Sequence, residues 1–199
     1  MGAGGIEIDV HSLGGELVVI HDSRLNRTTN GSGPLHRHTL DQIRRLDAGK
    51  GERIPLLREV LDTVNRRALI NIELKGRRTA APVLALLREV TTHHGWSPSD
   101  FLLSSFHRPE LRQLTGAGFP IGILFARSPR IYRPLARALG ASSIHVALPH
   151  ATPALVARVH ADSLKLFVFT VNAPVDIARM EQIGVDGIFT DFPDRQKKS

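Results

Sequence analysis

The stretch that decides the fold is Gly5–Asp22, GIEIDVHSLGGELVVIHD. Its first part, Ile6–Val10, alternates aliphatic and acidic residues, which is typical of a strand with one apolar face. In such a strand the aliphatic side chains share one face, and Glu7 and Asp9 share the other. Two carboxylates on one partly buried face repel each other. A divalent cation with oxygen ligands is the simplest way to neutralise them.

A second short strand is expected at Leu17–Ile20, and it ends in His21-Asp22. A histidine at a strand end, beside an acid and downstream of a carboxylate pair, is a candidate general acid or base. His21 is therefore our candidate catalytic residue. The loop that follows is rich in Asn, Thr, Ser and Gly, and we expect Arg27 to brace this loop against Asp22 rather than to bind phosphate.

A third segment, Leu69–Lys75, repeats the alternation as LINIELK. Its polar face carries Asn71, Glu73 and Lys75. Glu73 would add a third carboxylate to a hard-cation site, and Lys75 would contact a phosphate beside it. The plainer interpretation is a set of amphipathic strands with solvated polar faces. The position of His21 between the two acidic strands favours a site.

The rest of the chain alternates short apolar segments with amphipathic ones, which predicts parallel strands covered by helices. We expect strands at 6–10, 17–20, 69–75, 101–104, 121–125, 143–146, 165–171 and 187–190, and helices at 40–46, 56–64, 80–94, 108–115, 130–139, 153–161 and 175–183. Without the short strand at 17–20, seven strands remain, one fewer than in a (β/α)₈ barrel of about 250 residues. The expected fold is an α/β, TIM-type barrel truncated at its N-terminus. It forms a single domain over residues 1–199, with a small loop-and-strand excursion after the first strand.

Composition limits the function classes. The net charge is +7, but the arginines are scattered, and one Trp and one Tyr offer little for base stacking, so we expect no nucleic-acid partner. Cysteine is absent, which excludes a disulfide framework and a thiolate metal site. No apolar run is long enough to span a bilayer, and no signal peptide is visible. We expect a cytoplasmic protein, unless an upstream segment carries a signal.

The order of motifs resembles the glycerophosphodiester phosphodiesterase family. The matching segments are IEIDV, VVIHDSRLNRTTNGSG, ERIPLLREVL and NIELK, and the similarity runs from Gly5 to Asp194. The VVIHD-x-x-L-x-RTT run is the most specific of them. Members of the family usually open with a strand that ends in His-Arg-Gly and supplies a second catalytic histidine. This sequence has no such opening, in agreement with the count of seven strands.

The resemblance implies a metal-dependent phosphodiesterase that releases glycerol 3-phosphate and an alcohol from a glycerophosphodiester. Glu7, Asp9 and Glu73 would hold Ca²⁺ or Mg²⁺, Lys75 would contact the phosphate, and His21 would move the proton. The closing motif TVN of the family, which contains Asn172 here, implies a contact of this residue with substrate or with a carboxylate; a helix N-terminus before Pro174 is the other interpretation.

Two alternatives stay open. In one, the chain is a catalytically impaired remnant that binds metal and phosphate ligands without turnover. In the other, a neighbouring subunit completes the enzyme, possible because a barrel with a missing strand leaves open sheet edges that invite a homo-oligomer.

Overall fold

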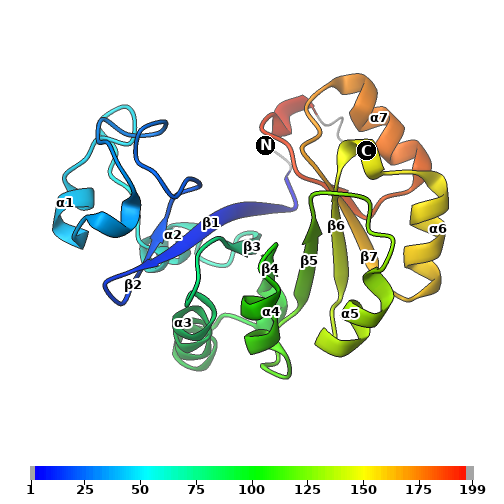
Figure 1. The fold of residues 1–199 in the computed structure, drawn as a ribbon, viewed down its shortest axis with the longest axis horizontal. Helices are drawn as coiled ribbons and strands as arrows, with labels where there is room; N and C mark the ends of the chain where they lie inside the picture. The colour runs from blue at the N-terminus through cyan, green and yellow to red at the C-terminus, as the bar shows by residue number, and fades with distance from the viewer. Residues whose placement is uncertain (1–2, 196–199) are drawn as a thin grey trace.

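The computed structural model describes residues 3–195, and its centre is one curled eight-stranded sheet with helices on its outer side (Figure 1). The strand order is β2-β1-β3-β4-β5-β6-β7-β8. Seven strands are parallel, and β2 pairs with β1 in the antiparallel direction. The strands are β1 (Gly5–Leu13), β2 (Glu16–Val19), β3 (Leu69–Leu74), β4 (Phe101–Ser105), β5 (Ile121–Phe125), β6 (Ser143–Ala147), β7 (Lys165–Phe169) and β8 (Gly187–Ile188). The predicted barrel-type α/β fold with seven parallel strands is confirmed.

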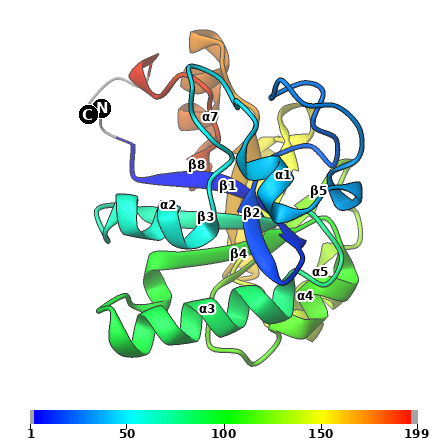
Figure 2. The same ribbon diagram turned by 90° about the vertical axis from the view of Figure 1, so that its left-hand side faces the viewer.

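Helices follow the strands in the alternation that the sequence predicts. They are α1 (Leu40–Arg44), α2 (Leu57–Val64), α3 (Ala80–His93), α4 (Arg108–Leu114), α5 (Tyr132–Leu139), α6 (Pro153–Ala161) and α7 (Pro174–Ile183), with short 3₁₀ turns at Leu35–Arg37, Pro98–Asp100, Leu148–His150 and Pro193–Arg195. Figure 2 shows α3 and α4 side by side on the outside of the sheet. Connections of this kind place all parallel strand ends at one mouth.

The register between β1 and β3 builds the acidic face. Glu7 lies opposite Asn71, and Asp9 lies opposite Glu73. Because side chains alternate along each strand, these four residues point to the inner, concave side of the curled sheet. The aliphatic residues between them face the helices, and Val10, Ile70 and Ile72 are among those with no measurable exposure.

Two hydrophobic cores hold the chain. The larger lies between the sheet and its helices and includes the fully buried Leu103, Ile144 and Leu166. The smaller lies under the excursion and contains Leu13, Val18, Ile20, Leu25, Leu35, Ile43 and Ile54. The excursion that precedes α2, visible on the left of Figure 1, is therefore a packed unit that fixes the segment after β2.

Within the described residues, the sheet is open between β8 and β1. The first half of β1 pairs only with β3, since β2 reaches only Val10–Leu13, and β8 pairs only with β7. The predicted open edges are present, and assembly through them stays a prediction.

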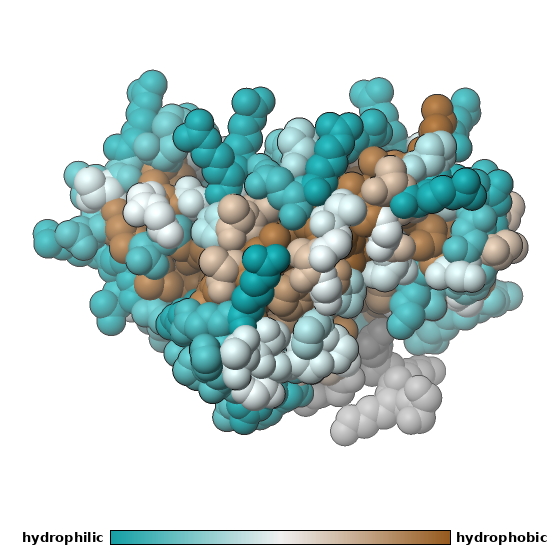
Figure 3. Space-filling view, turned by 90° about the horizontal axis from the view of Figure 1, so that it is seen from below, coloured by the Kyte–Doolittle hydropathy of each residue, from teal (hydrophilic) through white to brown (hydrophobic). Residues whose placement is uncertain are grey.

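Seen from below, hydrophobic residues show through the middle of the surface between hydrophilic ones (Figure 3). Among residues 3–195, no helix has both the length and the apolar character needed to cross a bilayer.

Five predicted boundaries are wrong by two or three residues. Strand β1 continues to Leu13 rather than ending at residue 10, because Val10–Leu13 pair with β2. Helix α1 ends at Arg44 rather than at residue 46. Strand β7 ends at Phe169 and β8 at Ile188, because regular pairing between them involves only Phe167 and Val168 of β7. A single hydrogen bond continues beyond it, from the Val171 N–H to the Phe189 carbonyl at 2.9 Å. Helix α5 starts at Tyr132 rather than at residue 130, because the Arg130 N–H is turned to the Ser128 carbonyl, at 2.9 Å, in a loop that precedes the helix.

Candidate active site

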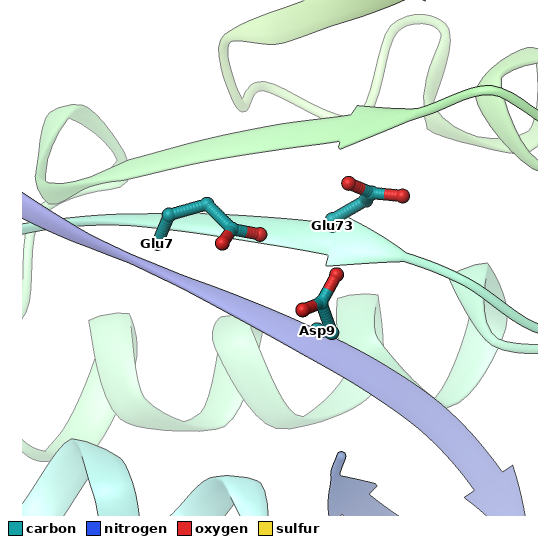
Figure 4. A group of neighbouring side chains, drawn as sticks. All are labelled: Glu7, Asp9 and Glu73. Carbon is teal, nitrogen blue, oxygen red and sulfur yellow. The ribbon is translucent and has the colours of Figure 1, made fainter. Parts of the chain in front are cut away.

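Three carboxylates from two adjacent strands converge at the concave side of the sheet. Glu7 and Asp9 come from β1 and Glu73 from β3, and Figure 4 shows their side chains turned toward one another. One oxygen from each lies within 4.8 Å of the others. Two oxygens bound to one Ca²⁺ can be about 5 Å apart, so all three can share one hard cation. The residues predicted as metal ligands are brought together.

The environment makes two of these carboxylates, Glu7 and Glu73, costly to ionise without a cation. Burial raises the pKa of Glu7 to about 8, with further contributions from the charges of Asp9 and Glu73. Although Glu7 is an exposed residue, it lines the cavity over the inner face of the sheet. Burial also raises the pKa of Glu73, against the opposing effect of Lys75. A bound divalent cation would offset both effects.

Lys75 follows β3 and lies over the acidic cluster. Its Nζ is 3.1 Å from Glu73 Oε1 and 3.4 Å from Asp9 Oδ1. Burial lowers the pKa of Lys75, but the two carboxylates outweigh this effect and raise it, so the ammonium is charged at neutral pH. One cation beside three carboxylates leaves negative charge in excess, and leaves Lys75 available to a phosphate next to a metal ion.

His21 lies across the cluster from β3, although 54 residues separate it from Lys75 in the sequence. Its Nδ1 donates to Asp22 Oδ1 at 2.6 Å, and its Nε2 is 3.4 Å from Lys75 Nζ. The carboxylate on one ring nitrogen sets the tautomer, so the Nε2 lone pair faces Lys75 and the acidic cluster. An imidazole in this arrangement can accept or donate a proton at a group held over the carboxylates.

Arg27 fixes the His21 loop through Asp22. Its Nε donates to Asp22 Oδ2 at 2.7 Å and its Nη2 to Asp22 Oδ1 at 2.8 Å, which is a bidentate pair. The Arg27 hydrogen bonds, and then the one from His21, hold the pKa of Asp22 well below its usual range. The prediction that Arg27 braces the loop on Asp22 is confirmed.

Asn172 takes a different position from the other predicted residues. Its Nδ2 donates to Asp191 Oδ2 at 2.7 Å, and its Oδ1 accepts from the Asp191 N–H at 2.9 Å and from Thr190 Oγ1 at 3.2 Å. The amide is therefore committed to the segment after β8. It holds Asp191, which lines the pocket, and a direct contact between Asn172 and substrate stays a prediction.

These groups line one cavity of about 630 Å³. Its acidic and basic side is formed by Glu7, Asp9, His21, Asp22, Arg27, Asn71, Glu73, Lys75 and Asp191, and its apolar side by Phe106, Leu124, His145, Phe169, Thr170 and Phe189. The cavity size suits a small organic phosphate. Of the predicted site residues, all but Asn172 line it.

Sequence reasoning missed several residues of this cavity. The sequence indicates Asp22 only as the acid beside His21 and as the partner of Arg27, and it gives no role to Asp191. No residue of the aromatic side is predicted as part of the site. On this side Phe106 packs edge-on against Phe169, with 5.8 Å between the ring centroids. For Asp22 the adjacent histidine was an available signal; for Phe106 a position right after β4 was the only one.

Comparison with known proteins agrees with this geometry. Residues 1–195 match the model of the Glycerophosphoryl diester phosphodiesterase family. The chain is 36% identical to a glycerophosphodiester phosphodiesterase of Bacillus altitudinis over 99% of the chain and 86% of that protein. It is 35% identical to the enzyme of the same name from Caldanaerobacter subterraneus, over 98% of the chain and 84% of that protein.

Solved structures give the same result. A phosphodiesterase of Oleispira antarctica, solved with the product sn-glycerol-3-phosphate, superposes with a TM-score of 0.88 at 26% identity, over 98% of this chain and 83% of that one. A glycerophosphodiester phosphodiesterase of Agrobacterium tumefaciens superposes with a TM-score of 0.80 at 30% identity, over 98% and 86%. With the family match across nearly the whole sequence, these likenesses show that the chain belongs to the glycerophosphoryl diester phosphodiesterase family, whose members are phosphoric diester hydrolases.

Proposed function

We propose that this chain hydrolyses glycerophosphodiesters to glycerol 3-phosphate and an alcohol, with Ca²⁺ or Mg²⁺ held by Glu7, Asp9 and Glu73. The observation that carries the proposal is the convergence of these carboxylates beside Lys75 and His21 in one cavity. Oxygen ligands from three carboxylates suit either cation, and the choice between them is left to experiment.

The metal ion would supply a Lewis acid next to a phosphate oxygen and offset negative charge that develops during hydrolysis. Lys75 would hold a second phosphate oxygen through its ammonium, which already leans toward the cluster at 3.1 Å from Glu73. The phosphate would thus lie between a cation and an ammonium, and its position would be fixed from two sides.

His21 would carry the proton. Its Nε2 would accept a proton from the attacking hydroxyl or donate one to the leaving oxygen, while Asp22 keeps Nδ1 protonated and stabilises the imidazolium. A second acid-base group is needed for the other proton transfer. Of the described histidines, only His21 and His145 line the cavity, and His145 is fully buried with its pKa lowered to about 3 by burial, so it is unsuited to that task.

Because the described residues offer no second histidine suited to proton transfer, a second candidate function is kept. In it, the chain is a module that binds metal and phosphate ligands without turnover. The third possibility, completion by another copy through the open edge beside β1, predicts activity that rises more steeply than protein concentration. The sheet is open between β8 and β1 within the described residues, and this edge is where an added strand would pair.

The test is release of glycerol 3-phosphate from glycerophosphocholine, with added Ca²⁺ or Mg²⁺, at several protein concentrations. Glu73→Ala is the negative variant, and Glu16→Ala, on the exposed end of β2, is the matched control. Metal-dependent release that Glu73→Ala loses and Glu16→Ala keeps supports hydrolysis. Metal binding without release, removed by Glu73→Ala, would support the binding module instead. Equal metal binding by Glu73→Ala and the parent would contradict the site.

A further inference from the structure

A second cleft, next to the candidate active site, has the opposite charge. It is lined by Phe106, by Arg108 of α4 and by β5 together with the loop 126–131, and its volume is about 460 Å³. Phe106 and Leu124 line both this cleft and the acidic cavity, so the two hollows share one wall. A ligand anchored in the acidic cavity can therefore extend across Phe106 into this neighbour.

The charge of the cleft comes from Arg108, Arg127 and Arg130, and no carboxylate lines it. The acidic cavity, in contrast, is lined by five carboxylates, those of Glu7, Asp9, Asp22, Glu73 and Asp191. Within residues 3–195, none of the ion pairs engages the three arginines of the cleft, and their side chains are exposed. Three uncommitted guanidinium groups around a small hollow are suited to bidentate binding of a phosphate.

We infer that this arginine cleft, defined by Arg108, Arg127 and Arg130, binds a second anionic group on the substrate. The inference rests on the proposed function and names its substrate class. The scissile phosphate is assigned to Lys75 and the acidic cluster, and the glycerol arm carries no charge. The second anionic group must therefore belong to the leaving alcohol. The preferred substrates are glycerophosphodiesters whose leaving alcohol bears a phosphate.

A polyanionic substrate also fits the charge of the whole chain. The net charge is +7, so diffusional approach of an anion is favoured, while the acidic cavity alone would repel it. The apolar wall of Phe106 and Ile123 covers the space between the two charged regions and suits the carbon skeleton of the alcohol.

The experiment compares three substrates with the full chain and a divalent cation. Glycerophosphocholine has a cationic leaving alcohol, glycerophosphoglycerol a neutral one, and glycerophosphoinositol phosphate an anionic one. The expected kcat/KM is about tenfold higher for the anionic than for the cationic substrate at low salt, and the ratio shrinks in 0.5 M salt, about three times the physiological ionic strength. In the double variant Arg127→Gln/Arg130→Gln this ratio falls to near one. The matched control Arg88→Gln/Arg137→Gln, which removes the same charge away from the cleft, keeps the parent ratio.

Binding of the same three compounds, measured by calorimetry, separates this inference from the proposed function. If none is hydrolysed but the anionic compound binds about tenfold more tightly in the parent and not in the double variant, the cleft stands and the hydrolysis proposal fails. If all are hydrolysed at similar rates, or if the double variant keeps the preference, the inference is overturned and hydrolysis stands.

The same guanidinium groups could instead meet the phosphates of a lipid surface. Sedimentation with phosphatidylglycerol vesicles, compared with sedimentation with phosphatidylcholine vesicles, tests this alternative. Vesicle binding that the double variant loses, without any preference among the soluble substrates, would assign the arginines to lipid headgroups and overturn the inference.

Discussion

The two sides of the acidic cavity hold their carboxylates in opposite ways. On the strand side, Glu7 and Glu73 project from the sheet, and burial raises the pKa of both. On the loop side, Asp22 is paired with Arg27 and His21, and these hydrogen bonds lower its pKa. The strand side thus keeps acidic groups in excess over the single ammonium of Lys75, and a bound cation would offset them, whereas Arg27 and His21 neutralise Asp22 on the loop side.

This difference indicates that the two sides of the cavity have separate roles. The strand carboxylates are positioned by backbone register, and Lys75 lies within ion-pair distance of two of them, Asp9 and Glu73. The loop residues are fixed by side-chain pairing, with the small excursion core behind them. We therefore expect substitutions on the strand side to act mainly on metal binding, and substitutions on the loop side to act mainly on turnover.

The largest effect is expected for Glu73→Gln. The variant keeps the size of the side chain but removes the central carboxylate, so affinity for Ca²⁺ or Mg²⁺ should fall about 100-fold or more. In the absence of metal it should unfold at the same temperature as the parent or higher, because a costly buried carboxylate is gone. Calorimetric titration and thermal unfolding measure the two quantities. A variant that still gains the parent's full metal-induced rise in Tm would contradict the strand-side assignment.

The second effect concerns the loop side. His21→Ala should lower kcat by about 10²–10⁴-fold, since it removes the proton-transfer group, and should leave metal affinity within about twofold of the parent. The matched control is His36→Ala, which removes an exposed histidine elsewhere in the excursion. Turnover by His21→Ala at the parent rate would exclude its acid-base role, and a large loss of metal affinity would show that the two sides are not separable.

The strand side was also the easier one to predict from the sequence. Alternation along Ile6–Val10 and Leu69–Lys75 specified which residues share a face, and parallel pairing then placed Asp9 opposite Glu73. Side chains along a strand alternate between its two faces with a period of two residues, so a local pattern is sufficient to assign them to a face. The seven parallel strands followed from the same reasoning, with errors of two or three residues at single ends of β1, β7, β8, α1 and α5.

The loop side could be predicted only in part. His21 and its brace on Asp22 were recognisable because three residues of one short segment carry the contacts. The approach of His21 to Lys75 depends on packing of the whole excursion, which no local pattern encodes. For the same reason the commitment of Asn172 to Asp191 and the arginine cleft after β5 were not visible, since each joins segments that come from different strand ends.

The third prediction uses the pH dependence of the strand side. Because the folded pKa of Glu7 is raised from 4.5 to about 8, the folded state binds more protons than the unfolded state between these values. Stability of the metal-free protein should therefore fall as pH rises from about 5 to 8, by a few degrees in Tm at most, since Glu7 is partly exposed. Glu7→Gln should flatten this slope. Saturating Ca²⁺ should flatten or reverse it in the parent, and an unchanged slope in Glu7→Gln would show that Glu7 is ionised in the metal-free fold.

The smallest effect is expected for Arg27→Gln. The pH dependence of stability that it tests has the opposite sign to that of Glu7. A carboxyl with a lowered folded pKa stabilises the fold above its unfolded pKa of about 3.9, and this contribution is lost as pH falls through the folded value. The parent should therefore exceed Arg27→Gln in Tm by about 2 °C at pH 6, with the difference narrowing below pH 4. Turnover should fall only about two- to tenfold, because Asp22 still holds His21.

The control is Arg24→Gln. It replaces an exposed arginine of the same loop that lies outside every ion pair found in residues 3–195, and it should show neither change. If Arg27→Gln abolished turnover while its Tm stayed at the parent value, Arg27 would contact the substrate itself, and the loop side would bind phosphate as well as carry the proton.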